Sequence, residues 1–80
     1  MSLPRDIDFS ELIKNLKKLG YETARQKGSY IRLITELNGK HAITVPAHDP
    51  IKVGTLNAII SDIAEHFKIS KNELIKKLFN

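Results

Sequence analysis

Basic and small residues follow one another in the stretch "ARQKGSYIRL", residues 24–33. Cationic side chains and the backbone amides of a tight turn are groups that proteins use to contact phosphate. The stretch therefore predicts a phosphate-binding segment made of Arg25, Lys27, Gly28, Ser29 and Arg32. The alternative is a solvated strand edge, where charges discourage unwanted pairing with another strand.

Two further side chains have the chemistry for proton transfer or base contact. His48 lies in the irregular stretch "PAHDP", and an imidazole, ordinarily with a pKa of about 6.5, exchanges protons readily near neutral pH. Tyr30 follows Ser29. A phenol, ordinarily with a pKa of about 10, stays protonated at pH 7, so it suits a hydrogen bond to phosphate or stacking on a base better than proton abstraction. The alternatives are a solvated loop histidine and a half-buried strand tyrosine.

The remaining histidines are predicted to be structural. His41 is expected to face Glu36 across a hairpin as a polar pair, and His66 lies near the end of a helix, where a cation is favourable. No histidine pair has a ligand spacing such as His-x-x-x-His, so we expect neither a metal site nor a cofactor.

The composition limits the class of protein. The 80 residues predict one small domain, and the absence of cysteine excludes disulfides and thiolate zinc sites and suits a reducing cytoplasm. A formal net charge of +4 is compatible with a polyanion or with an acidic protein partner. No segment approaches the roughly 20 apolar residues needed to span a bilayer, so no membrane partner is expected.

Changes in hydrophobic period predict the elements that position these residues. A capping box at residues 8–11 opens an amphipathic helix that ends at Gly20. Alternation then predicts strands at residues 21–26, 30–37 and 40–45. A second helix is expected from about residue 55 to 67, and a short third helix follows a capping box formed by Ser70 and Glu73. The order favours an α+β fold, α-β-β-β-α, with a three-stranded antiparallel sheet, helices on one face and an additional C-terminal helix.

The hairpin turn carries an internal conflict. Asn38-Gly39 is typical of a two-residue turn, which would place Leu37 opposite Lys40, Glu36 opposite His41, Ile34 opposite Ile43, and Arg32 opposite Val45. The face that carries Ile34, Ile43 and Val45 would then be too apolar to meet water. We therefore expect a partner or the third helix to cover it.

Several short motifs resemble, in their order and spacing, the HicA (YcfA-like) family of bacterial toxin mRNA interferases over residues 10–66: Gly20, Gln26-Lys27-Gly28-Ser29, Val45-Pro46 with His48, and Gly54-Thr55-Leu56. The resemblance implies a double-stranded-RNA-binding-like fold, metal-independent endoribonuclease cleavage of single-stranded mRNA, and neutralisation by a HicB-type antitoxin. It also implies that the catalytic position is the one after Gly-Ser, where this chain has Tyr30 in place of the family's histidine.

Three hypotheses follow. The first is a HicA-like RNA-binding toxin in which cleavage is either weak or uses His48 to transfer the proton that Tyr30 does not. The second is a non-catalytic RNA- or protein-binding domain on the same scaffold. The third is a mainly structural role in assembly. Residues 1–80 are expected to form a single domain with a family-like core at about residues 10–67. The additional helix at about residues 70–79 then packs either on that core or on a second copy as a homodimer, through its apolar residues Leu74, Ile75, Leu78 and Phe79.

Overall fold

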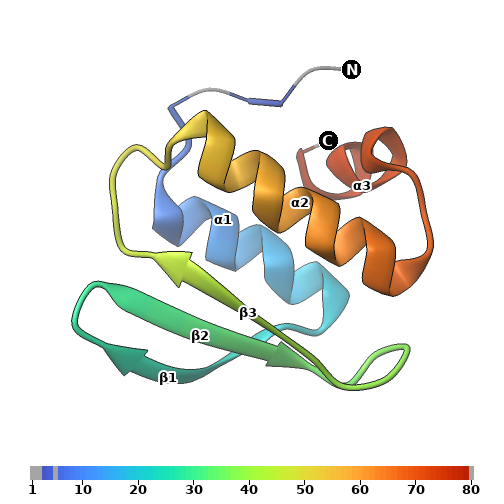
Figure 1. Cartoon of the computed structure of the whole chain (residues 1–80), viewed down its shortest axis with the longest axis horizontal. Coiled ribbons are helices and arrows are strands. Elements are labelled where there is room, and N and C mark those ends of the chain that lie inside the picture. Colours follow the sequence, from blue (N-terminus) through green and yellow to red (C-terminus); the bar gives the residue numbers. More distant parts are fainter. Residues whose placement is uncertain (1–2, 5, 80) are drawn as a thin grey trace.

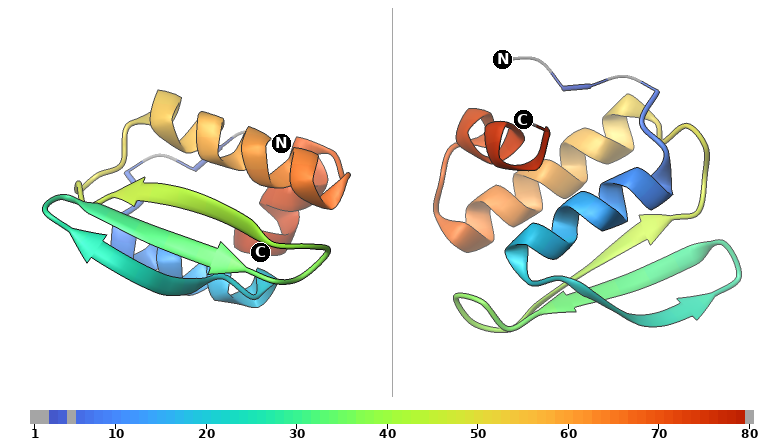
Figure 2. Two further views of the ribbon diagram at one scale, coloured as in Figure 1. Left: turned by 60° about the horizontal axis from the view of Figure 1, so that its bottom comes forward. Right: turned by 180° about the vertical axis from the view of Figure 1, so that it is seen from behind.

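Helices and strands follow one another in the predicted order. The structure, a computed structural model, describes residues 3–4 and 6–79. Its elements are α1 (Phe9–Leu16), the single-turn 3-10 helix η1 (Lys17–Leu19), β1 (Glu22–Lys27), β2 (Tyr30–Thr35), β3 (His41–Pro46), α2 (Val53–Phe67) and α3 (Lys71–Phe79). The strands form one antiparallel sheet in the order β1-β2-β3, and the helices lie on one side of it (Figures 1 and 2). The α+β fold with a double-stranded-RNA-binding-like arrangement is therefore confirmed.

The sheet has one buried face and one exposed face. Ile31 and Leu33 of β2 and Ile43 and Val45 of β3 belong to the core, together with the apolar sides of α1 and α2. All residues of β1, by contrast, are exposed. This strand is one edge of the sheet, and a bulge interrupts its pairing with β2 between Thr23 and Arg25.

The predicted register of the β2–β3 hairpin is wrong. Asn38 and Gly39 do adopt positive φ angles of 58° and 95°, but the loop spans residues 36–40 instead of two residues. The observed partners are Thr35 with His41, Leu33 with Ile43, and Ile31 with Val45. A slip of one residue moves every side chain of a strand to the other face. The longer loop is favoured because it turns Ile43 and Val45 into the core.

This register removes the conflict seen in the sequence. The outer face carries Tyr30, Arg32, Ile34, Ala42 and Thr44, of which only Ile34 is a large aliphatic side chain. The predicted apolar face, which was the reason to expect a cover, is therefore wrong. The third helix lies elsewhere, against α1 and α2.

The C-terminal helix packs on its own chain, one of the two alternatives left open by the sequence. Leu74, Ile75 and Leu78 are buried in the core, and Lys18 Nζ donates a 3.4 Å hydrogen bond to the carbonyl of Leu78. The predicted cap of α3 is confirmed for the serine, since Ser70 Oγ accepts a hydrogen bond from the Glu73 amide at 3.0 Å. Within the described residues, no helix is long and apolar enough to cross a bilayer.

The predicted capping box of α1 is not formed. Asp8 occupies the N-cap position without a side-chain capping bond. The free amide of Phe9 instead donates to Oδ1 of Asp49 at 3.0 Å, a residue 40 positions further along the chain. At the other end, Gly20 ends the helical segment with φ of 81°, as its sequence position predicts.

Candidate nucleic-acid interface

The three cations among the predicted phosphate-binding residues lie on the outer face of the sheet, and Gly28 and Ser29 form the turn between β1 and β2. Arg25 lies opposite Arg32, and Lys27 lies opposite Tyr30, across the β1–β2 pair. Directly paired residues share a face, and the intervening Ile31 and Leu33 point into the core. We name Arg25, Lys27 and Arg32 the strand-face cations. Tyr30 lies among them with 61% of its surface exposed, so the predicted half-buried alternative does not apply.

The turn between β1 and β2 is tied to the loop that carries His48. Gly28 has a φ of 58°, which its lack of a side chain permits. The carbonyl of the next residue, Ser29, accepts a hydrogen bond from the amide of Ala47 at 2.6 Å. Because Pro46 lies opposite Tyr30 and His48 follows two residues later, the predicted RNA-binding turn and the candidate imidazole occupy the same end of the sheet.

His48 borders a small pocket. Its side chain is exposed and lines a pocket of about 150 Å³ together with Pro46, Lys52 and Thr55. The helix α2 begins directly beside it, with Lys52 as N-cap and without a side-chain capping bond. The α2 helix starts two residues earlier than predicted, so the family-like Gly54-Thr55-Leu56 lies within its first turn.

The electrostatics of this end of the sheet favour an anion. In the part of the chain that the structure describes, the ion pair that forms is His41–Asp62, so no described carboxylate lies within ion-pair distance of the strand-face cations. Arg25 and Arg32 are directly opposed like charges, an arrangement that destabilises a strand pair. A polyanion laid across this face would relieve that repulsion. The chemistry available is therefore phosphate binding by guanidinium and ammonium groups, stacking or hydrogen bonding by Tyr30, and proton transfer by the imidazole of His48.

Sequence reasoning missed a second cluster at the opposite end of the sheet. The hydroxyl of Tyr21 lies 2.7 Å from Nδ1 of His41, and Nε2 of His41 lies 3.2 Å from Oδ1 of Asp62. The ring of His66 stacks on that of His41 at 4.4 Å between centroids. The predicted pairing of His41 with Glu36 is wrong, because the longer hairpin loop turns His41 to the helix side of the sheet. The available signal was the alternation of His41, Ile43 and Val45, which share one strand face.

Hydrogen bonds join this cluster to the hairpin loop. His66 Nε2 donates to the carbonyl of Leu37 at 2.9 Å, and Asn38 Nδ2 donates to the carbonyl of His66 at 2.9 Å. The C-terminal end of α2 therefore holds the loop of residues 36–40. His66 has a structural contact that the sequence did not predict.

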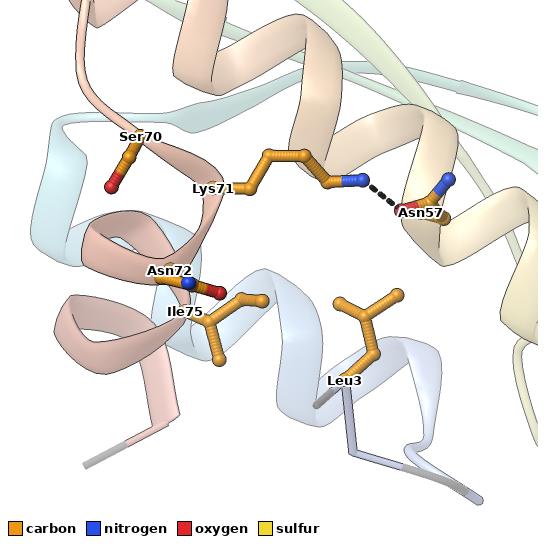
Figure 3. Close-up of a pocket in the computed structure, with 6 residues that line it drawn as sticks. All are labelled: Leu3, Asn57, Ser70, Lys71, Asn72 and Ile75. Atoms are coloured by element: carbon orange, nitrogen blue, oxygen red, sulfur yellow. Dashed lines mark hydrogen bonds between the residues drawn. The ribbon is translucent and has the colours of Figure 1, made fainter. Parts of the chain in front are cut away.

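Larger hollows lie away from all of these residues. One of about 470 Å³ lies between α2 and α3 (Figure 3), where Lys71 donates a hydrogen bond to Asn57. It contains none of the predicted site residues. Among residues 3–4 and 6–79, no group of three or more histidines and carboxylates is placed to hold a metal ion.

Comparison with known proteins identifies the family. The sequence profile described as "HicA toxin of bacterial toxin-antitoxin" matches residues 9–64, more than half of the chain. The searches of curated proteins and of solved structures found no match. The matched region begins at the first residue of α1 and ends within α2, so it includes the strand-face cations, Tyr30 and His48. The chain therefore belongs to the HicA toxin family of bacterial toxin–antitoxin systems.

Proposed function

We propose that the protein is a toxin that binds single-stranded mRNA across the outer sheet face and cleaves it as a metal-independent endoribonuclease. The observation that carries the proposal is the grouping of Arg25, Lys27, Arg32 and the exposed Tyr30 on one face, at the end of the sheet where His48 lies. Membership of the HicA family supports the toxin role and, by resemblance, the cleavage reaction.

In this proposal the RNA supplies its own nucleophile. The 2′-hydroxyl loses its proton to the imidazole of His48, and the resulting oxygen forms a bond to the adjacent phosphorus. The bond from phosphorus to the 5′-oxygen breaks, and that oxygen takes up a proton from water. The products are a 2′,3′-cyclic phosphate and a 5′-hydroxyl. Arg32 and Lys27 compensate the charge on the phosphate, and Tyr30 stacks on a base or donates a hydrogen bond to a phosphate oxygen.

The test is cleavage of a labelled single-stranded RNA in excess chelator by the wild type, His48→Ala and Tyr30→His. We expect the wild type to cut and His48→Ala to lose about a hundredfold or more in rate, in the range of a general base. Full activity of His48→Ala would remove His48 from the mechanism. A matched control is His66→Ala, which removes an imidazole far from the proposed interface.

A second candidate function is binding without cleavage. It is favoured by Tyr30 at the position where the resemblance places the family's catalytic histidine. Under it, the wild type binds the RNA without cutting it, and Tyr30→His introduces cleavage on an intact scaffold. Metal-independent cleavage that purifies with the wild-type protein excludes this candidate.

Family membership implies an antitoxin partner, and we propose that it is a HicB-type protein acting on this toxin in the cytoplasm. The proposal treats residues 1–80 as a single domain. It includes no homodimer through α3, because Leu74, Ile75 and Leu78 are buried in the core of the same chain and Phe79 is partly buried against it. Light scattering of the purified chain tests this, with the mass of a monomer as the expected result.

A further inference from the structure

The loop between β3 and α2 is fixed to neighbouring elements on both sides of His48. On the N-terminal side, the amide of Ala47 bonds to the carbonyl of Ser29. On the C-terminal side, the amide of Ile51 donates to the carbonyl of Ile7 at 2.9 Å, and the side chain of Ile51 is buried. In Figure 1 this loop runs beside the beginning of α1. Between these two attachments lie His48, Asp49 and Pro50.

Asp49 supplies the attachment within this interval. Its Oδ1 accepts the hydrogen bond from the amide of Phe9 at 3.0 Å. The carboxylate therefore satisfies the first amide of α1, a helix whose N-cap residue Asp8 makes no side-chain capping bond, and a negative charge is favourable at a helix N-terminus. Among the described residues, this is the hydrogen bond that joins residues 48–50 to α1, whereas the amide of His48 bonds to the carbonyl of Pro46, the last residue of β3, at 2.8 Å.

The imidazole of His48 has no hydrogen bond or ion pair to another described residue. Its placement is set by the backbone of the loop, and the neighbouring carboxylate is directed at α1 through its Oδ1. A reacting group must be held close to its target, because a displacement of about 1 Å costs on the order of a hundredfold in rate. The position of the His48 side chain must therefore be restrained through the backbone of the loop and the residues next to it.

We propose that Asp49 is a positioning residue for His48, which it restrains by capping α1 from the loop. The inference rests on the proposed function, in which His48 transfers the proton. It assigns to Asp49 a hydrogen-bonding role toward Phe9 and no contact with the RNA. Two substitutions separate the bond from the charge: Asp49→Asn keeps an oxygen that accepts from the Phe9 amide, whereas Asp49→Ala removes it.

The experiment measures kcat and KM on labelled RNA and the ¹⁵N relaxation of the His48 amide in the full chain. Asp49→Ala is expected to lower kcat by about tenfold to a hundredfold with KM unchanged within about twofold. Its His48 order parameter should fall from about 0.85 to below about 0.6. Asp49→Asn is expected to match the wild type in both measurements. A loss of kcat in Asp49→Asn as large as in Asp49→Ala overturns the proposal, because the charge and not the bond would then be essential.

A matched variant distinguishes positioning of the loop from a general effect of charge at the start of α1. Asp8→Ala removes a carboxylate at the same helix terminus that makes no capping bond. We expect it to leave both kcat and the His48 order parameter unchanged. A loss of kcat in Asp8→Ala as large as in Asp49→Ala overturns the proposal.

The order parameter of the His48 amide tests the positioning role independently of whether the protein cleaves RNA. A wild type that does not cleave refutes the cleavage reaction but leaves the relaxation measurement intact. A His48 amide as rigid in Asp49→Ala as in the wild type overturns the positioning role, whatever the cleavage result.

Discussion

The phenol oxygen of Tyr21 lies 2.7 Å from Nδ1 of His41. Tyr21 is 0% exposed, and burial together with the nearby charge of Asp62 raises the pKa of its hydroxyl. The hydroxyl therefore keeps its proton and donates it to Nδ1. The proton of a neutral His41 then lies on Nε2, where it is donated to Asp62. One chain of hydrogen bonds thus links the residue before β1, the start of β3 and the helix α2.

Replacing Tyr21 with phenylalanine tests this chain of hydrogen bonds. The variant keeps the buried ring but leaves Nδ1 of His41 without its donor. We expect the free energy of unfolding to fall by about 1–2 kcal/mol, the cost of a partly buried polar group that loses its partner. Urea unfolding of Tyr21→Phe measures this. Tyr30→Phe is the matched control, because it removes a hydroxyl from an exposed ring and should change stability by less than about 0.5 kcal/mol.

The raised pKa of Tyr21 also predicts a dependence of stability on alkaline pH. Because the folded-state pKa lies above the unfolded value of about 10, the protonated hydroxyl contributes stability that is fully present below pH 10. That contribution is lost as the pH rises from about 10 toward the folded-state pKa. The measurement is urea unfolding from pH 8 to 11. The difference between wild type and Tyr21→Phe should be constant up to about pH 9.5 and shrink above it; a difference that grows with pH would contradict the assignment.

The register of the hairpin predicts which residue of β3 supports the core. Ile43 is buried and Thr44 is exposed, whereas a two-residue turn would reverse the two faces. Ile43→Ala is expected to cost about 2–4 kcal/mol of unfolding free energy. Thr44→Ala should cost less than about 0.5 kcal/mol. Similar losses in the two variants would be incompatible with this register.

The strand-face cations predict a salt-dependent affinity for RNA. Replacing Arg25 and Arg32 with glutamine should reduce the slope of log K against log salt by about 0.7 for each lost phosphate contact on a single strand. Stability should be unchanged or rise by a few tenths of a kcal/mol on the scale of one cross-strand pair, since two opposed like charges are removed. Fluorescence anisotropy with labelled RNA measures the slope. Lys14→Gln, on the exposed side of α1, is the control, and an equal effect there would argue against a binding face on the sheet.

Local patterns were sufficient to predict the elements of the fold. The apolar positions of α1 and α2, including Leu12, Leu16, Ile60 and Ile63, recur at helical spacing, and all four are buried. The hairpin register was not predictable in the same way. Asn38 and Gly39 take the backbone conformation that their types favour, but the burial of Ile43 and Val45 against helices far away in the sequence decides the length of the loop.

In the candidate site, too, local patterns predicted some of the placements, and contacts between residues distant in sequence determine the others. Strand alternation was enough to predict that Arg32 shares a face with Tyr30, and the structure places both there. The bonds from Ala47 to Ser29 and from Phe9 to Asp49 join residues that no local pattern connects. The same is true of the contact between Tyr21 and His41, which depends on the correct register. The functional roles of these residues remain predictions.

The exposed strand β1 has a consequence for how molecules meet one another. As one of the two edges of the sheet, it presents backbone amides and carbonyls to which a strand of a second molecule could add. The bulge between Thr23 and Arg25 breaks the regular spacing of those groups, and Arg25 and Lys27 add charge on the same strand. A copy of β1 from a second molecule would meet an irregular backbone, and the Arg25 and Lys27 charges of the two strands would repel each other. These features disfavour the addition of a second β1 strand at this edge of the sheet.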